Sequence, residues 1–398
     1  MSLLPSPPIT EIADLKRIYR RRAPRMFYDY CETGSWSGQT FRENTSDFQK
    51  LYFRQRVAVD MTHRTTETTL FGQTVAMPVA LAPVGLLGMQ SADGEIKAAQ
   101  AAEAFRVPFT LSTLSICSIE DVAERTTKPF WFQVYTLKDD DFMDRLIARA
   151  KAAGVETLVI TLDLQLQGQR HKDIKNGLSA PPKPTLATLL NLATKVPWGL
   201  EMLGTPRRTF RNVVGHAEGV KDPASLTAWT GQAFDQSLDW ARVAELRRKW
   251  EGPVILKGIL DVEDARRAVD VGADGIVVSN HGGRQLDGAL SSIRALEPIV
   301  EAVGDKVEIL LDSGIRSGQD ILKALALGAK GTMVGRAFVY GLGAMGKAGV
   351  TSALSVMQKE LEYSMALSGR IEIPAIDRDM LLVPKGFAGD WDRPIVQN

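Results

Sequence analysis

The segment SNHGGRQLDG, residues 279–288, combines residue types that could accept a proton and bind an anion. His281 follows the apolar run GIVVSN, and a neutral imidazole can act as a base near pH 7. The two glycines after it permit a tight turn and the close approach of a flat ligand. Arg284 carries a guanidinium that matches a carboxylate in bidentate geometry. We interpret His281 as a general base, the alternative being a histidine that only satisfies loop hydrogen bonds.

Asp163 and Arg170 extend this constellation from another part of the chain. A base that takes up a proton gains positive charge, so a nearby carboxylate stabilises it. Asp163 ends the apolar run TLVITLD and is our candidate for that carboxylate. Arg170 lies seven residues further on, and two arginines at one mouth predict a carboxylate substrate. The alternatives are a helix N-cap for Asp163 and surface salt bridges for the arginines.

Two glycine-rich turns near the C-terminus predict a phosphate site. They read DSGIRSG, residues 312–318, and VGRAF, residues 334–338. Backbone N–H groups of Gly314 and Gly335, with the charge of Arg336, would bind a phosphate dianion. The chain shows neither the GxGxxG pattern of a Rossmann fold after its first strand nor a P-loop.

Lys257 ends another apolar run, PVILKG, inside the same expected mouth. A buried lysine there could form a Schiff base or could stabilise an anionic cofactor. The residues alone leave both roles open.

Eight short apolar runs, rich in β-branched residues, predict strands that are buried on both faces. They span residues 79–84, 108–112, 131–135, 157–163, 253–258, 275–280, 307–312 and 331–335. Amphipathic helical patterns lie between them, as at residues 95–105, 139–153, 261–271 and 318–327. This alternation predicts an α/β fold, a (β/α)8 TIM barrel, with a doubly wound open sheet as the alternative. In a barrel, all the candidate residues fall at the carboxyl ends of strands, where active sites form.

The remaining segments are expected to decorate one domain spanning residues 1–398. Residues 1–75 should form an N-terminal helical cap, and residues 76–348 the barrel. Residues 164–236 are a long insertion after the fourth strand, too long for an ordinary loop, and should be functional, mobile or both. Residues 349–398 should form a C-terminal helix and tail.

Composition narrows the class of protein. A net charge of +1 gives no electrostatic reason to expect nucleic acid as a partner. The two cysteines form no CxxC pair, so neither a metal site nor a disulfide framework is predicted. The N-terminus lacks the apolar core of a secretion signal, and no run of 18 apolar residues occurs. We expect a cytoplasmic location.

Taken together, the motifs resemble one known family, the FMN-dependent L-2-hydroxy acid dehydrogenases and oxidases. This family includes glycolate oxidase, lactate oxidase, mandelate dehydrogenase and the respiratory L-lactate dehydrogenases. The resemblance rests on SNHGGRQLDG, LLDSGIRSG and VGRAFVYGLG, and it extends from FYDYCETGS (residues 27–35) to EYSMALSG (residues 362–369).

The resemblance implies a role for each matching residue. His281 would be the catalytic base and Asp163 its partner, while Arg284 and Arg170 would hold the substrate carboxylate. Tyr30 and Tyr135 match the two active-site tyrosines. The residues implied to contact FMN are Pro83, Val84, Gly85, Ser112, Gln133, Thr161, Lys257, Ser279, Asp312, Gly314, Arg316, Gly335 and Arg336. For Lys257, this implies a cation beside the flavin N1–O2 edge, which favours reduction.

The implied reaction is two-electron oxidation of a small L-2-hydroxy acid to the 2-oxo acid, with L-lactate as the expected substrate. Gly85 stands where alanine is frequent among the oxidases, and Leu114 where plant-type glycolate oxidase has tryptophan, which argues against glycolate. The run LQLQGQR makes Arg170 the less secure arginine. A soluble oxidase that makes hydrogen peroxide is one alternative. A non-catalytic flavin- or phosphate-binding barrel, or a phosphate-substrate isomerase using Lys257, is another.

The insertion bears on the electron acceptor, quinone or oxygen. Residues 181–214 combine apolar and basic side chains, which is typical of an interfacial membrane anchor. The apolar face is expected to comprise Leu186, Leu189, Leu190, Ala193, Trp198, Leu200, Met202 and Leu203, and the charge to come from Lys195, Arg207, Arg208 and Arg211. Peripheral contact with the inner face of the cell membrane would serve a quinone-linked dehydrogenase. The alternative is packing on the barrel or on another subunit, and the resemblance implies a homotetramer.

Overall fold

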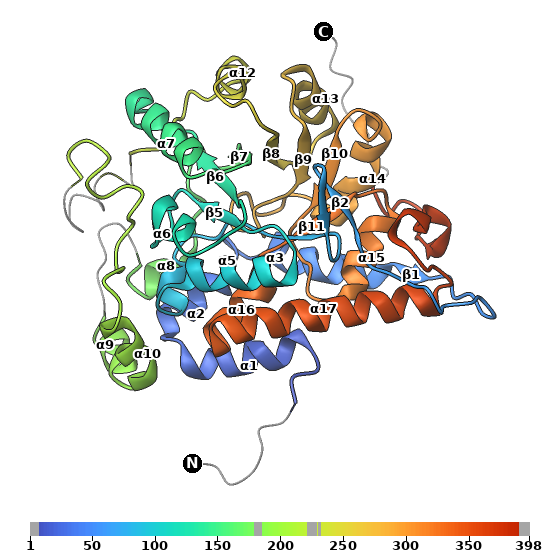
Figure 1. Cartoon of the computed structure of the whole chain (residues 1–398), viewed down its shortest axis with the longest axis horizontal. Helices are drawn as coiled ribbons and strands as arrows, with labels where there is room; N and C mark the ends of the chain where they lie inside the picture. Colours follow the sequence, from blue (N-terminus) through green and yellow to red (C-terminus); the bar gives the residue numbers. More distant parts are fainter. Residues whose placement is uncertain (1–7, 179–184, 221–228, 230–231, 390–398) are drawn as a thin grey trace.

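The computed structural model describes residues 8–178, 185–220, 229 and 232–389 (Figure 1). Residues 181–184 of the expected membrane segment and the last part of the C-terminal tail lie outside this range.

Eight parallel strands form one closed sheet. Its order is β4-β11-β10-β9-β8-β7-β6-β5, and a parallel bridge between Leu81 and Phe109 joins the two ends. The strands are β4 (Val79–Leu81), β5 (Thr110–Ser112), β6 (Trp131–Tyr135), β7 (Thr157–Thr161), β8 (Val254–Ile259), β9 (Gly275–Val278), β10 (Glu308–Leu311) and β11 (Gly331–Val334). The predicted TIM barrel is confirmed, and the doubly wound alternative is wrong.

The strands are apolar on consecutive residues because both of their faces are buried. One set of side chains fills the barrel interior: Ala80, Ala82, Trp131, Val159, Ile255, Val277, Leu310 and Met333. Their neighbours, such as Leu81, Phe132 and Leu158, point outward and pack under the helices. This two-sided burial produces the runs from which the barrel was predicted.

Helices alternate with the strands and surround the barrel (Figure 1). The helices that follow barrel strands are α4 (Leu87–Gln90), α5 (Gly94–Phe105), α6 (Ile119–Ala123), α7 (Asp140–Ala152), α12 (Trp240–Arg248), α13 (Val262–Asp270), α14 (Ser292–Val303), α15 (Gly318–Ala326), α16 (Arg336–Met345) and α17 (Lys347–Leu367). Side-chain caps begin several of them; Asp139, for example, accepts from the N–H of Phe142 at 2.8 Å.

The N-terminal segment covers both ends of the barrel instead of one. Helices α1 (Ile12–Arg22), α2 (Arg25–Cys31) and α3 (Gln39–Ser46) and the turn η1 (Asp47–Lys50) come first, with α1 against α16. The hairpin of β2 (Thr68–Leu70) and β3 (Gln73–Val75) closes the amino end, because Leu70 and Val75 join the interior cluster. Strand β1 (Tyr52–Phe53) pairs with β12 (Leu381–Leu382) of the C-terminal segment, which also contains η2 (Ile373–Ala375) and η3 (Arg378–Met380).

The insertion after β7 contains α8 (His171–Lys175), α9 (Leu186–Ala193) and α10 (Val196–Leu203). Helices α9 and α10 lie beside α1 and α2, at the lower left of Figure 1. Asn191 accepts from the N–H of Arg25 at 2.7 Å, and Lys195 donates to the carbonyl of Arg21 at 2.7 Å. One side of this helical pair is therefore fixed to the N-terminal helices.

The apolar and basic faces assigned to the insertion need correction. Trp198 stacks on Phe27 with ring centroids 5.6 Å apart, and Met202 is buried, so these two residues belong to the inner side. Arg207 is largely buried and forms ion pairs with Asp93 and Asp121, so it belongs to the inner side as well; Arg211 pairs with Asp121 and stays partly exposed. Leu186, Leu189, Leu190, Leu200 and Leu203 are exposed, as predicted.

The hairpin at the amino end allows a test of the barrel core. Leu70 is fully buried, and we expect Leu70→Ala to lower the free energy of unfolding by about 2–5 kcal/mol through the cavity that it leaves. Urea unfolding followed by tryptophan fluorescence measures the change. Thr69→Ala, an exposed change on the same strand, is the control. Equal unfolding midpoints for the two variants would contradict the conclusion that the β2–β3 hairpin stabilises the barrel by closing its amino end.

Candidate active site

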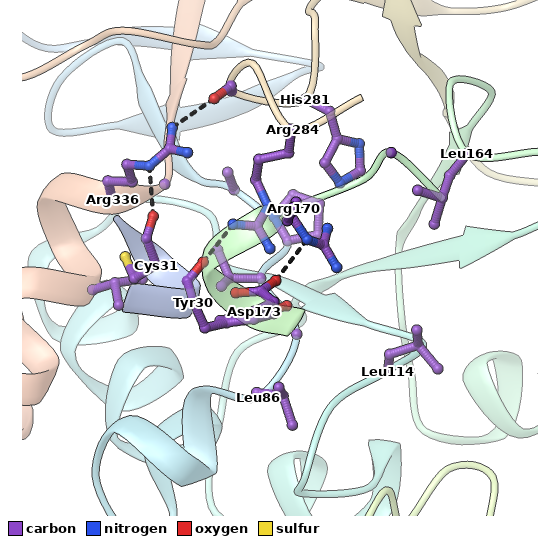
Figure 2. Close-up of a pocket in the computed structure, with 18 of the residues that line it drawn as sticks. Tyr30, Cys31, Leu86, Leu114, Leu164, Arg170, Asp173, His281, Arg284 and Arg336 are labelled. Carbon is purple, nitrogen blue, oxygen red and sulfur yellow. Dashed lines mark hydrogen bonds and ion pairs between the residues drawn. The ribbon is translucent and has the colours of Figure 1, made fainter. Parts of the chain in front are cut away.

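A cavity of about 780 Å³ opens at the carboxyl ends of the strands (Figure 2). Its wall contains most of the residues that the sequence singled out: Tyr30, Pro83, Val84, Gly85, Tyr135, Thr161, Arg170, Lys257, His281, Arg284, Asp312, Gly314, Arg316, Gly335 and Arg336. The others, Ser112, Gln133, Asp163 and Ser279, lie directly behind this wall and bond to one another or to its members.

His281 and Asp163 form a hydrogen-bonded pair. Nδ1 of His281 lies 2.8 Å from Oδ1 of Asp163, which leaves Nε2 as the nitrogen available to a ligand. The backbone of His281 has a φ of 58°, an uncommon conformation for a side chain of this size. Its N–H donates to Oγ of Ser279 at 3.1 Å, which helps to hold that conformation. The imidazole is thus fixed in both tautomer and direction.

The pairing of Asn44 with Asn280 fixes the turn from the other side. Each amide donates to the other across buried bonds of 2.8 and 2.7 Å, and Oδ1 of Asn280 also accepts from the N–H of Gly283. The sequence analysis missed this pair, although Asn280 directly precedes His281. It ties α3 to the turn that carries the base.

Gly258 makes the His281–Asp163 contact possible. Asp163 follows β7 and His281 follows β9, while β8 runs between these two strands. At Gly258 the φ is 107°, and a Cβ atom there would lie 2.7 Å from Cγ of Asp163. The register shift between Lys257 and Ile259 occurs at the same point. Because β8 has a glycine at this position, no side chain separates Asp163 from His281.

The charge environment keeps Asp163 ionised. Burial alone would raise its pKa, but the nearby His281 and Lys257 outweigh burial and lower the pKa below its ordinary value. Oδ2 of Asp163 is buried and has no partner among the described residues. An ionised carboxylate at this position stabilises a positive charge on His281.

Arg170 and Arg284 meet at the ring of Tyr30. Their guanidinium carbons lie 5.8 and 4.5 Å from the ring centroid, and Arg284 donates to the carbonyl of Tyr30. Burial and the charge of Arg284 lower the pKa of Arg170. Two neighbouring cations in a partly buried cavity favour an anionic ligand, as predicted from their residue type.

Asp173, which the sequence analysis missed, orients Arg170. Its Oδ2 accepts from Nε of Arg170 at 2.7 Å, so the terminal Nη groups remain for a ligand (Figure 2). Burial raises the pKa of Asp173 despite the neighbouring arginines. The available signal was its position three residues after Arg170, a spacing that places two side chains on one helical face.

Tyr135 ends β6 inside the cavity and packs edge-on against Phe234, with ring centroids 5.5 Å apart. Burial, together with the nearby Tyr30 and Asp163, raises its pKa well above the ordinary value. Tyr135 therefore stays protonated and can donate a hydrogen bond.

Lys257 is a buried cation with fixed partners. Nζ lies 2.9 Å from Oδ2 of Asp312 and 2.9 Å from Oγ of Ser279. Burial would lower its pKa, but Asp312 and Asp163 outweigh burial and raise it. A lysine that stays protonated is a poor Schiff-base nucleophile, so of the two roles open in the sequence, stabilisation of an anion is favoured.

Arg336 bonds the N-terminal segment and also lines the cavity. It donates to the carbonyls of Cys31, Gly282 and Thr33 at 2.8–2.9 Å, which ties α2 to the turn carrying His281 (Figure 2). These bonds engage three of the five N–H groups of the guanidinium. Burial and the charge of Arg316 lower its pKa to about 10. Its remaining donors can still meet an anion in the cavity.

Comparison with known proteins identifies the family. The model of the FMN-dependent dehydrogenase family matches residues 19–383. The chain belongs to this family. The L-lactate dehydrogenases of Actinobacillus pleuropneumoniae (serotype 5b, strain L20) and Caulobacter vibrioides (strain NA1000) are 48% and 44% identical to it. These matches cover 94% of this chain and 98% and 97% of the relatives.

Solved structures agree with this assignment. The monotopic membrane protein (S)-mandelate dehydrogenase superimposes with a TM-score of 0.90 at 32% identity, over 95% of this chain and all of that one. A mandelate oxidase bound to (S)-4-hydroxymandelic acid gives 0.81 at 36% identity, over 94% and 98% of the two chains. The resemblance seen in the sequence is confirmed, and with it FMN as the cofactor and a 2-hydroxy acid as the class of substrate.

The cavity of this FMN-dependent dehydrogenase fits its cofactor. Nε2 of Gln133 and Oγ1 of Thr161 are buried without partners among the described residues, while Ser112 occupies Oε1 of Gln133. These two groups could bond the polar edge of the flavin ring. A Cβ atom on Gly335 would meet only Ala82, at 3.9 Å, so this glycine faces open space suited to a phosphate.

Gly258 provides a test of the site geometry. We expect Gly258→Ala to push Asp163 away from His281 and to slow flavin reduction by a 2-hydroxy acid about 100-fold or more, since small misplacements of this kind are costly. Stopped-flow absorbance of the flavin measures the rate. Gly272→Ala is the control, because Gly272 also has a positive φ but no atom within 4 Å of its Cβ position. Equal rates in the two variants would show that the empty position is unnecessary.

Proposed function

We propose that this protein oxidises L-lactate to the 2-oxo acid and passes the electrons to a quinone. The observation that carries the proposal is one cavity into which His281, bonded to Asp163 behind the wall, faces together with Arg170 and Arg284. A base beside a carboxylate-binding site is the arrangement that a 2-hydroxy acid requires. The relatives named L-lactate dehydrogenase support the choice of substrate.

In this proposal, the chain positions the substrate and moves one proton. Arg284 and Arg170 bind the carboxylate, with Tyr30 between them, and Asp173 keeps Arg170 turned toward the cavity. Nε2 of His281 takes the substrate proton while Asp163 stabilises the imidazolium. Bound FMN supplies the acceptor for the two electrons. Proton-first and hydride routes at the α-carbon use the same base.

The cofactor contacts are part of the same proposal. Lys257 would supply a fixed positive charge beside the flavin ring, which favours its reduction. Gln133, Thr161, Ser112, Ser279 and the backbone of residues 83–85 would hold the ring. Asp312, Gly314, Arg316, Gly335 and Arg336 would hold the ribityl chain and the phosphate.

Flavin bleaching tests the chemistry. We expect the yellow protein to bleach anaerobically on addition of L-lactate, and His281→Gln to keep FMN bound but to lose bleaching by at least 1,000-fold, since the base is removed. His63→Gln, an exposed change far from the cavity, is the control. A wild-type protein that does not respond to L-lactate would contradict the substrate, and near-normal bleaching in His281→Gln would contradict the base.

Exposed leucines on α9 and α10 support peripheral membrane docking. Leu186, Leu190 and Leu203 are 73%, 62% and 72% exposed, on helices whose other side is fixed to α1 and α2. Within the described residues, none of the helices has the length and hydrophobicity needed to span a bilayer. A helical pair with one fixed side and one apolar side fits the interfacial region of a membrane. Docking on the inner face of the cell membrane would give the flavin access to quinone.

Vesicle binding tests this docking. We expect the triple variant Leu186→Gln, Leu190→Gln, Leu203→Gln to lose cosedimentation with anionic phospholipid vesicles and to slow lactate-dependent reduction of a long-chain quinone in them. Bleaching by L-lactate should remain. Val57→Gln, Leu367→Gln, Leu382→Gln, which removes exposed apolar side chains elsewhere, is the control. Formation of hydrogen peroxide in air at full rate without quinone would instead favour a soluble oxidase.

The homotetramer stays a prediction, which sedimentation analysis can test.

A further inference from the structure

A short segment of the insertion forms part of the cavity wall. We name residues 205–212 the strap; it follows α10 and leads back toward the barrel. Arg208, Thr209 and Phe210 of the strap line the cavity together with Leu114. Oγ1 of Thr209 is buried without a partner among the described residues. The insertion thus contributes a surface to the site that no barrel strand provides.

Ionic contacts hold the start of the strap. Oγ1 of Thr205 donates to Asp93 at 2.6 Å, and Arg207 bonds both Asp93 and Asp121 at 3.2 and 2.9 Å. Arg211 reaches Asp121 at 2.8 Å. These pairs join the strap to the starts of α5 and α6, so its path is set on the outside of the barrel.

Asn212 joins the strap to the loop after β5. Its side chain is fully buried; Nδ2 donates to Oγ of Ser115 at 2.9 Å, and Oδ1 accepts from the N–H of Ile119 at 2.9 Å. Arg149 donates to both the carbonyl and the side-chain oxygen of Asn212. A buried amide with all these bonds satisfied fixes both partners, because breaking them leaves unpaired polar groups.

The loop of residues 113–118, between β5 and α6, carries Leu114 and Ile116, which also line the cavity. Its second anchor is the buried Glu95, which accepts from the N–H of Ile116 at 2.9 Å. The carbonyl of Leu114 accepts from the N–H of Leu86 and would lie 3.1 Å from a Cβ on Gly85. Asn212 and Glu95 therefore both bond residues that directly follow Leu114, Asn212 through Ser115 and Glu95 through Ile116.

We infer that Asn212 is a positioning residue that sets the side-chain preference of the enzyme. In the proposed function the arginines fix the substrate carboxylate, so the side chain of a 2-hydroxy acid extends into a cavity whose apolar lining includes Leu114 and Phe210. Asn212 bonds the loop that carries Leu114 and lies two residues after Phe210 in the chain. The inference rests on the proposed function and adds to it an element that selects among substrates.

A substrate panel tests the inference. In Asn212→Ala the loop loses one anchor, so the ratio of kcat/KM for an L-2-hydroxy acid with an n-butyl side chain to that for L-lactate should rise at least tenfold. The kcat for L-lactate should stay within about threefold, because His281, Asp163 and the arginines are untouched. Asn212→Asp keeps the acceptor for Ile119 and should shift the ratio less.

Controls separate this role from general stability. Asn191→Ala, which removes an insertion amide that contacts α2 and not this loop, should leave the ratio unchanged. Ser115→Ala removes the acceptor of the bond from Nδ2 of Asn212 and should also raise the ratio of the two kcat/KM values. This variant tests the inference independently if Asn212→Ala does not fold. An unchanged ratio in folded, FMN-loaded variants overturns the inference. A wild-type protein that L-lactate does not bleach instead overturns the proposed function.

Discussion

The 2.8 Å contact between His281 and Asp163 is the constraint on which the site depends, because the two residues follow strands that are not neighbours. β8 lies between them, and only the absence of a side chain at Gly258 lets them meet. The same strand places Lys257 one residue earlier, beside Asp312 and within reach of the charge on Asp163. One register shift in one strand therefore arranges His281, Asp163 and Lys257.

The contacts of the N-terminal segment follow from the same requirement. A histidine with a φ of 58° needs bonds that hold its turn in place. Asn44 on α3 bonds the side chain of Asn280 in this turn, and Arg336 donates both to the carbonyl of Gly282 in the turn and to a carbonyl of α2. Asp287, at the end of the same sequence motif, accepts from the N–H groups of Gly38 and Thr40 at the start of α3. Since α2 also carries Tyr30, the same bonds position His281 and the tyrosine at which Arg170 and Arg284 meet.

Much of the barrel could be predicted because two-sided burial leaves a local signal; β6 was predicted with its observed bounds. Other predicted strands extended too far, as at residues 82–84, since apolar residues continue past the strand to line the cavity. The partners of Arg207 could not be predicted. Asp93 and Asp121 precede it by 114 and 86 residues, and only the folded chain brings them together. Trp198 and Met202 were placed on the wrong face because α10 is apolar on both sides.

The cavity is built from two sources that differ in how freely they can change. His281, Asp163 and Lys257 come from the ends of strands, where a shift of one residue reverses the side-chain direction. The apolar wall includes residues of the strap and of the loop after β5. Side-chain bonds join these two segments to each other and to the starts of α5 and α6, while Thr113 also bonds the loop to β6. A change in the strap can therefore alter which substrate side chain fits without moving His281. The same insertion carries the exposed leucines, so in this fold the substrate wall and the proposed route to the membrane are parts of a single segment.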